Sequence, residues 1–311
     1  MKHKLPRSNL TRSGVVRHHG GRTPGEHMVV KRIGVVGTGQ MGAGVAEVAA
    51  RAGFQVVVRS RTDTGTAALL AAIARSLARQ VDKGKLDASA RDDALGRVRA
   101  VTALDELSSC DLVSESIVED LDTKRALFAE LDRVCAPTAI LTTNTSTLPI
   151  VDLAVSTNRP ELVCGVHFFN PVPAMSLVEI APALTTAPST TDAARAFVEA
   201  CGKTAVMVKD QAGFVVNALL FPYLNNAVKL LDAGVATRDD IDAAMKGGCN
   251  FPMGPLELLD LVGLDTSLAI LEALYAESSD QSVAPARLLR RMVTAGHLGR
   301  KCGLGFYDYS S

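Results

Sequence analysis

A glycine-rich loop between a strand pattern and a helix pattern restricts the fold of this chain more than any other feature. The apolar run at residues 31–36 leads into Gly37-Thr38-Gly39-Gln40-Met41-Gly42, a complete G-x-G-x-x-G. A helix pattern rich in small residues follows to residue 52, and a second apolar run occupies residues 55–58. This strand–loop–helix–strand order is the context in which the motif binds dinucleotides. The segment therefore predicts a nucleotide-binding βαβ unit, and the alternative is a purely structural turn.

Each glycine of the loop has a separate physical task. Gly37 would allow the tight turn, Gly39 would let the backbone approach a pyrophosphate, and Gly42 would let the helix pack closely on the strand. The free N–H groups at the start of the helix would then face the phosphates. We expect the loop to contribute these cofactor-binding residues: Gly37, Gly39, Gln40, Met41 and Gly42.

The residues after the second strand should select the nicotinamide cofactor. An acidic side chain about 20 residues after the glycines would bind the ribose 2′-hydroxyl of NAD. Here the segment is Arg59-Ser60-Arg61, and the nearest acid, Asp63, lies further along. Guanidinium groups suit a 2′-phosphate, so the sequence favours NADP, with NAD still possible. The alternatives are that the arginines are solvated or that Arg59 stacks on adenine.

A histidine and a glutamate in neighbouring strand patterns predict an acid–base pair. His167 ends the apolar run at residues 162–166, and Glu179 lies in a second run at residues 177–180. Ligands bind at the carboxyl ends of strands in open α/β sheets, where a histidine can exchange a proton near neutral pH. A carboxylate beside it would fix the imidazole tautomer. The alternative is a structural histidine with a surface glutamate.

The order of patterns along the chain predicts two domains. Strand and helix patterns alternate in residues 28–210, which predicts an α/β fold with a Rossmann-type doubly wound sheet. Residues 211–311 are almost entirely helical in pattern, apart from a predicted strand at residues 306–309. This all-α C-terminal domain should bind substrate. The apolar helix predicted at residues 214–231 is longer than one layer of partners would cover, so we also expect it to form a homodimer.

Composition excludes several classes of function. The 311 residues carry no net formal charge, which argues against nucleic acid and anionic membrane partners, and no apolar run approaches the length of a membrane helix. The six cysteines form no C-x-x-C, so they indicate reduced thiols in a cytoplasmic protein and no metal site. Residues 1–27 are basic and contain a single acid, and we expect a disordered leader there.

With these motifs in hand, the chain resembles the L-3-hydroxyacyl-CoA dehydrogenases, particularly the bacterial 3-hydroxybutyryl-CoA dehydrogenases. The resemblance covers about residues 31–309. The motifs that carry it, in the family's order, are residues 37–42, Asn144-Thr145-Ser146, His167 to Pro173, Gly213 to Asn217, Pro252 to Pro255, Asp260 to Asp265, and Gly303 to Tyr307.

The resemblance implies a role for each matching residue. His167 would be the catalytic base, and Glu179 would pair with it, while Ser146 and Asn217 would contact the reacting oxygen. Asn170 would join Ser146 and Asn217 in binding an acyl-CoA substrate. Three further residues are assigned to the cofactor: Glu119, Lys124 and Asn144.

The implied reaction interconverts a short-chain (3S)-3-hydroxyacyl-CoA, most simply 3-hydroxybutyryl-CoA, and the 3-oxoacyl-CoA. Two other functions remain open at this point. One is a dehydrogenase of a free 3-hydroxy acid, and the other is a non-catalytic dinucleotide sensor. Ser146 and Asn217 alone could also be cap or loop residues, since both types favour such positions. Arg59 stands where many members of the family have an acid.

Overall fold

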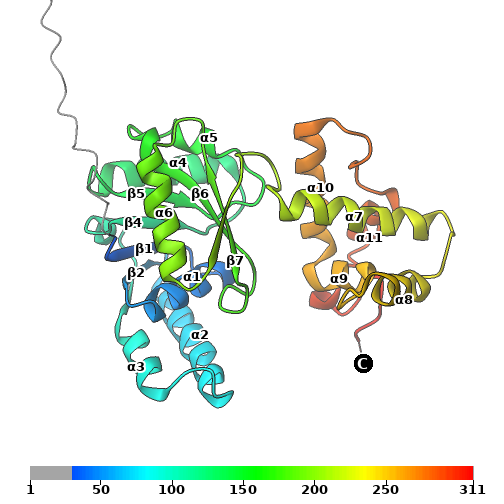
Figure 1. Cartoon of the computed structure of the whole chain (residues 1–311), viewed down its shortest axis with the longest axis horizontal. Coiled ribbons are helices and arrows are strands. Elements are labelled where there is room, and N and C mark those ends of the chain that lie inside the picture. Colours follow the sequence, from blue (N-terminus) through cyan, green and yellow to red (C-terminus); the bar gives the residue numbers. More distant parts are fainter. Residues whose placement is uncertain (1–29, 311) are drawn as a thin grey trace, which may run out of the picture.

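The computed structural model describes residues 30–310, and the basic leader predicted at residues 1–27 lies outside them. Two parts stand side by side, and the chain passes between them once, just before helix α7 (Figure 1). The first part is built on a sheet, and the second is helical. Among the described residues, no helix is both long and apolar enough to cross a membrane.

The first part contains one eight-stranded sheet with the order β3-β2-β1-β4-β5-β6-β7-β8. Every neighbouring pair of strands is parallel except β6 and β7, which run antiparallel. The order reverses direction at β1, as in a doubly wound sheet, and the predicted fold class is therefore confirmed. The strands are β1 (Arg32–Val36), β2 (Gln55–Arg59), β3 (Val98–Val101), β4 (Leu112–Glu115), β5 (Ile140–Thr143), β6 (Val163–Phe168), β7 (Leu177–Pro182) and β8 (Thr204–Met207).

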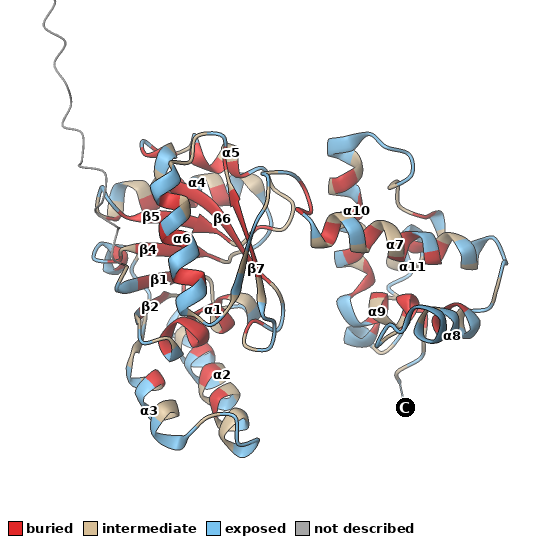
Figure 2. Ribbon diagram, viewed as in Figure 1, coloured by how far each residue is buried: buried red, intermediate tan, exposed pale blue. Residues whose placement is uncertain are grey.

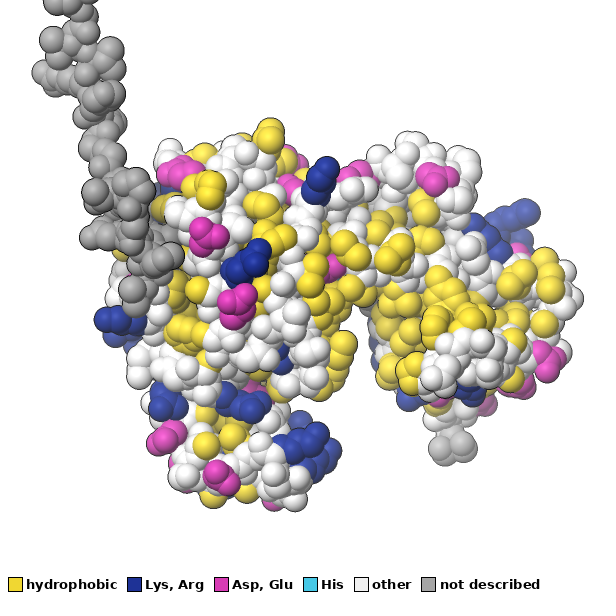
Figure 3. Space-filling model, viewed as in Figure 1, with side chains coloured by type: hydrophobic (Ala, Val, Ile, Leu, Met, Phe, Trp, Pro, Cys, Tyr) yellow, Lys and Arg dark blue, Asp and Glu magenta, His cyan; other side chains and the backbone are white. Residues whose placement is uncertain are grey.

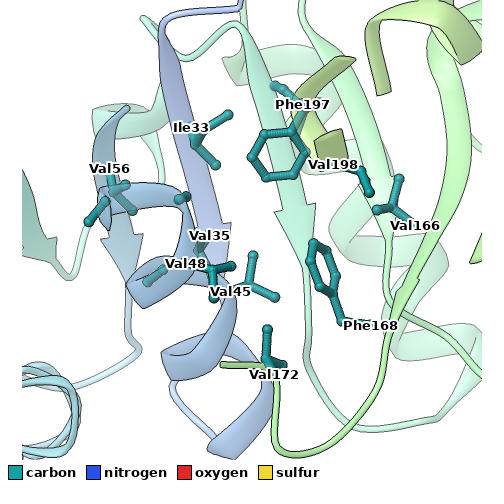
Figure 4. Packing of buried hydrophobic residues seen from close by; sticks show 14 of the residues in the cluster. Ile33, Val35, Val45, Val48, Val56, Val166, Phe168, Val172, Phe197 and Val198 are labelled. Atoms are coloured by element: carbon teal, nitrogen blue, oxygen red, sulfur yellow. The ribbon is translucent and has the colours of Figure 1, made fainter. Parts of the chain in front are cut away.

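Helices cover both faces of the sheet and form two separate cores. One core packs α1, α2 and α6 against the sheet, and Figure 4 shows Val45 of α1 and Phe197 of α6 beside Phe168 of β6. The other core packs α4 and α5 against the opposite face. The helices of this part are α1 (Gln40–Arg51), α2 (Asp63–Asp82), α3 (Ala88–Gly96), α4 (Leu121–Val134), α5 (Ile150–Ala154) and α6 (Pro188–Ala200).

The second part is a bundle of helices around a third core. The helix α7 contacts α8, α9, α10 and α11, and Phe221, Leu224, Leu256 and Leu271 are buried between them. Figure 2 shows buried residues on the inward sides of these helices and exposed residues on the outside. The helices are α7 (Val216–Asp232), α8 (Arg238–Cys249), α9 (Pro255–Val262), α10 (Leu264–Ser278) and α11 (Arg287–Thr294).

One predicted element is wrong. Residues 306–309 form no strand and take part only in an isolated bridge between Leu304 and Asp308. The backbone N–H groups of Phe306 and Tyr307 donate instead to the buried carboxylate of Asp260, each at 2.8 Å. The backbone of this segment is therefore held on the helical core by a side-chain carboxylate and not by a partner strand. An alternating apolar pattern in the sequence does not distinguish these two arrangements.

The long apolar helix starts later than predicted. Its expected first residue, Phe214, has a φ of 44° and lies in the turn that precedes α7. Gly213 has a φ of 75°, so two successive residues adopt left-handed backbone conformations. The turn redirects the chain from the sheet into the bundle, and it places the first N–H groups of α7 beside the end of the sheet.

Candidate active site

His167 and Glu179 lie directly opposite each other on neighbouring strands. Antiparallel pairing of β6 and β7 aligns the two residues, and side chains so aligned point to the same face. The Nδ1 atom of His167 is 2.9 Å from Oε2 of Glu179. His167 is 4% exposed and Glu179 is 1% exposed. The pairing expected from the sequence is thus present as a buried hydrogen bond.

The second oxygen of Glu179 binds the start of the helical part. Oε1 accepts the backbone N–H groups of Val215 and Val216, both at 3.0 Å. Burial raises the pKa of the Glu179 carboxyl, but the hydrogen bonds from His167 and these two N–H groups outweigh burial and hold the pKa below its ordinary value. Glu179 is therefore a carboxylate that connects the imidazole to the base of α7.

Ser146 contacts the other nitrogen of the imidazole. It follows β5, and its Oγ is 3.0 Å from Nε2 of His167. The carbonyl oxygen of Ser146 accepts the N–H of Gly213 at 3.0 Å, which fixes the loop to the turn before α7. The rings of Phe169 and Phe214 lie 4.6 and 5.4 Å from the imidazole centroid. These contacts leave Nε2 as the nitrogen available for chemistry.

Glu119 organises the loop that carries Ser146. Its Oε1 accepts the N–H of Ser146 at 2.8 Å and the hydroxyl of Thr145. Its Oε2 lies 3.4 Å from Nζ of Lys124, which forms a 2.6 Å ion pair with Glu115. Lys124, expected to contact the cofactor, is 1% exposed and lies behind Glu119. In this structure Glu119 alone of the two lines the cleft.

His167 lines a cleft of about 700 Å³ between the two parts. Figure 3 shows the surface hollowed between them, with hydrophobic side chains on both facing walls. The bundle contributes four residues of α10 to the cleft, namely Asp265, Thr266, Ala269 and Ile270. From the sheet part come Met41, Ser116, Ile117, Glu119, Asn144, Ser146, Thr147, Leu148, His167, Phe168, Phe169 and Asn170.

Asn144 and Asn217 differ in their surroundings. Asn144 lines the cleft, but its Oδ1 accepts the N–H of Phe168 at 2.7 Å, so it also secures the histidine strand. Asn217 is 8% exposed at the start of α7 and does not line the cleft. Asn170 does line it. The structure therefore brings Ser146, His167 and Glu179 into contact and places Asn170 in the same cleft. Asn217 lies at the start of α7 and does not line this cleft.

A second cavity of about 670 Å³ surrounds the glycine loop. Its walls include all five expected loop residues except Gly42, and also Arg59 and Arg61. A Cβ added at Gly39 would meet no atom within 4 Å, so the backbone of the loop borders open space at this position, as close approach of a ligand requires. A Cβ at Gly42 would lie 2.1 Å from the Gly37 carbonyl oxygen, so this glycine serves the close packing of α1 on β1.

The two cavities are neighbours. Met41, Ser116 and Ile117 line both of them, so the arginines border one cavity and His167 borders the next. The buried hydroxyl of Ser116 has no hydrogen-bond partner within the described part of the chain. An orphaned polar atom at this junction is consistent with a polar ligand. No group of three His, Cys, Asp or Glu side chains within residues 30–310 is placed to hold a metal ion.

Sequence reasoning missed three residues of the site. Glu115 is fully buried at the end of β4, Ser116 follows it, and Asp265 begins α10 at the cleft. The first two could have been found from their place at a strand's carboxyl end, where ligands bind. Asp265 belongs to a motif that carries the family resemblance, but the sequence assigned it no role, because only the approach of α10 to the sheet brings it to the cleft of His167.

Two family models match most of the chain, one for each part. Residues 32–211 match the family model "3-hydroxyacyl-CoA dehydrogenase, NAD binding domain", and residues 213–309 match "3-hydroxyacyl-CoA dehydrogenase, C-terminal domain". The chain is 46% identical over 282 residues to a 3-hydroxybutyryl-CoA dehydrogenase of Mycobacterium tuberculosis, which covers 90% of this chain and 99% of that protein.

Two further relatives carry the same enzyme name. A 3-hydroxybutyryl-CoA dehydrogenase of Bradyrhizobium diazoefficiens is 45% identical over 281 residues, which cover 90% of this chain and 96% of that protein. The crystal structure of (S)-3-hydroxybutyryl-CoA dehydrogenase from Ralstonia eutropha superimposes with a TM-score of 0.89 at 41% identity, over 91% of this chain and 100% of that one.

Proposed function

The chain belongs to the 3-hydroxyacyl-CoA dehydrogenase family, and we propose that it interconverts a short-chain (3S)-3-hydroxyacyl-CoA and the corresponding 3-oxoacyl-CoA. We propose 3-hydroxybutyryl-CoA as the substrate, because the relatives named above act on it and one is named for its S form. The observation that carries the proposal is the arrangement Ser146–His167–Glu179, with distances of 3.0 and 2.9 Å at the two imidazole nitrogens.

The imidazole handles the proton of the reaction. The chemistry that a nicotinamide cofactor would supply in this site, when bound, is hydride transfer at substrate C3. When hydride leaves C3, the 3-hydroxyl must lose its proton, and His167 Nε2 is the base that faces the cleft. In the reverse direction His167 returns this proton. Ser146 donates to the developing oxyanion, an interaction that strengthens in the transition state.

Glu179 keeps the base in its active form. Because the carboxylate accepts from Nδ1, the proton of a neutral imidazole stays on Nδ1 and Nε2 carries a free lone pair. When Nε2 takes the substrate proton, the same carboxylate stabilises the imidazolium. We propose Asn170, which lines the cleft, and Asn217, which lies at the start of α7, as substrate-binding residues.

Two observations favour a CoA thioester over the alternatives. Among residues 30–310, no Lys or Arg lines the cleft around His167, and a free 3-hydroxy acid would need such a group for its carboxylate. A non-catalytic sensor would not need the imidazole held at both nitrogens. The cleft instead offers Leu148, Phe169 and Ile270 as apolar surface for a short acyl chain.

We propose NADP as the preferred form of the nicotinamide cofactor, with NAD also accepted. Arg59 and Arg61 flank Ser60 on the wall of the cavity that holds the glycine loop. The Nε of Arg59 donates to the carbonyl of Thr102 at 3.2 Å, which orients its guanidinium. Asp63 begins α2 and does not line this cavity, so no carboxylate of this segment competes for a ribose diol.

We propose that residues 28–210 bind the dinucleotide, whereas residues 211–311 complete the substrate site and mediate a homodimer. In the single chain, three apolar side chains of the α7 region are largely exposed, as expected for a face that a second copy covers in a dimer. They are Val215, Leu219 and Leu230, at 47, 72 and 47% exposure. We propose a cytoplasmic location, because the six cysteines form no disulfide and reduced thiols are typical of that compartment. Sedimentation at micromolar concentration should give twice the monomer mass, and a stable monomer would contradict the dimer.

The direct test of function is reduction of acetoacetyl-CoA, with NADPH and NADH compared at the same concentrations. Consumption of the reduced cofactor is followed by its absorbance. We expect turnover with this thioester and none with free acetoacetate. Binding of cofactor without turnover of any 3-oxoacyl-CoA would favour the sensor.

A further inference from the structure

Two carboxylates and a single cation lie together at the wall of the cleft, and Glu119 is the one of the three that lines it. Nζ of Lys124 lies 2.6 Å from Glu115 and 3.4 Å from Glu119. Glu115 and Lys124 are 0 and 1% exposed, whereas the Glu119 side chain is 39% exposed and lines the cleft. We call these three residues the acidic cluster.

Both carboxyl groups of the acidic cluster are surrounded by donors. Glu115 accepts from the backbone N–H of Ile117, from Lys124 and from the hydroxyl of Thr143, at 2.6, 2.6 and 2.7 Å. The Oε1 of Glu119 accepts backbone N–H groups and a hydroxyl from the loop that carries Ser146. These contacts, with N–H groups, an ammonium group and hydroxyls around the carboxyl oxygens, are the ones that two carboxylates accept. One lysine then leaves the cluster with one negative charge in excess.

Two further carboxylates near the cleft, Asp265 and Glu179, are held by partners of their own. Asp265 forms an ion pair with Lys301, with Nζ at 2.5 and 2.6 Å from the two carboxylate oxygens. Glu179 is bound by His167 and by the first N–H groups of α7. The excess negative charge of the cluster is therefore not cancelled by a neighbouring free cation among the described residues that line the cleft.

We propose that the acidic cluster makes the site discriminate between the two redox forms of the cofactor and favours the oxidised form. This inference rests on the proposed function, because hydride transfer requires the nicotinamide ring to contact a substrate whose hydroxyl reaches His167. Glu119 lines that same space. The oxidised ring carries a positive charge, and the reduced ring carries none. A nearby uncompensated carboxylate therefore stabilises the bound oxidised ring selectively.

Substitution of Glu115 tests the charge effect without changing any side chain that lines the cleft. Glu115 does not line the cleft, so it cannot touch cofactor or substrate, yet it supplies half of the cluster's negative charge. Glu115→Gln removes one charge and keeps an oxygen for Ile117 and Lys124. The ratio of the dissociation constants for NADPH and NADP⁺ should then fall about threefold to tenfold, the size expected for a unit charge acting across several ångströms of protein.

The experiment is calorimetric titration of the full chain with NADP⁺ and with NADPH, without acyl-CoA, at low and at high salt. Glu119→Gln is the second variant, in case the fully buried Glu115 does not tolerate substitution. It should lower the ratio in the same direction. Glu130→Gln is the matched control, because Glu130 lines the cavity of the glycine loop and not the cleft at His167. Loss of this charge should shift both affinities equally and leave the ratio unchanged.

The outcomes separate the inference from the function on which it rests. Binding of both cofactor forms with a ratio unchanged in Glu115→Gln and Glu119→Gln would overturn the inference and leave the proposed function standing. An equal fall of the ratio in Glu130→Gln would overturn it as well, since the effect would then be general. Absence of binding for every nicotinamide dinucleotide in the unsubstituted protein would overturn the proposed function itself.

Discussion

The two neighbouring cavities, the nucleotide end at the glycine loop and the reaction end at His167, are built in different ways. At the nucleotide end, the residues that identify the site lie within one βαβ unit, from Gly37 to Arg61. At the reaction end, Glu119, Ser146, His167 and Asp265 come from four separate segments. A local motif needs only its own backbone to be correct. The reaction end needs strand register, a loop fixed by Glu119 and the approach of a second domain.

This difference predicts different consequences of substitution. Changes at the nucleotide end should alter which cofactor is bound, with little effect on the chemical step. Changes at the reaction end should alter turnover, with little effect on cofactor choice. The following experiments test that separation.

The largest effect should come from His167. We expect His167→Ala to reduce kcat by about 10² to 10⁴, the usual contribution of general acid–base catalysis. The dissociation constant of the cofactor should stay near normal, because the imidazole does not line the cavity of the glycine loop. His297→Ala is the control, since His297 does not line the cleft. Unchanged kcat in His167→Ala would refute the assignment of the base.

Glu179→Gln should give the next largest loss, on the order of tenfold to 1,000-fold in kcat, because the wrong imidazole tautomer becomes favoured. The amide oxygen can still accept from Val215 and Val216, so the amide nitrogen must face His167. Nδ1 then accepts and Nε2 carries the proton, which prevents it from acting as a base. Steady-state kinetics with both cofactors should show an equal loss with each. Wild-type turnover would show that the two residues are not coupled.

Arg59→Asp should change cofactor choice by about tenfold or more, since a charge-assisted contact to a 2′-phosphate contributes roughly 1.5–3 kcal/mol. We expect the unsubstituted protein to prefer NADPH and the variant to prefer NADH, with kcat for the favoured cofactor little changed. The ratio of kcat/KM values measures this. Arg195→Asp, a charge reversal at an exposed position of α6, is the control. A clear NADH preference in the unsubstituted protein would refute the role given to Arg59.

The smallest effect concerns acid stability. The folded-state pKa of Glu179 lies below its ordinary value of 4.5, so its contribution to stability is fully present above that pH and is lost as pH falls through the folded pKa. The difference in Tm between the protein and Glu179→Gln should therefore shrink on acidification below about pH 4.5. Glu106→Gln, which removes one partner of an exposed pair with Arg99, should show a smaller difference throughout. A Tm difference independent of pH would contradict the ionised state of Glu179.

Much of the fold could be predicted because its signals are local. The loop from Gly37 to Gly42, the strand patterns around His167 and Glu179, and the change to helical patterns near residue 211 each depend on neighbouring residues. The weaker elements α3, β3 and α5 were not predicted, because their short patterns resemble loops. The strand predicted at residues 306–309 was wrong, since Asp260 replaces the partner strand.

The sequence by itself determined the nucleotide loop, the arginines beside it and the presence of a histidine and a glutamate on adjacent strand patterns. Only the tertiary structure decided how these residues meet. Antiparallel register sets Glu179 opposite His167, and the turn at Gly213 brings the N–H groups of α7 onto the same carboxylate. Lys124 shows the limit most clearly. The resemblance to the family implies a cofactor contact for Lys124, and that contact stays a prediction. The tertiary structure adds that the buried lysine is paired with the buried carboxylate of Glu115, as a buried cation requires.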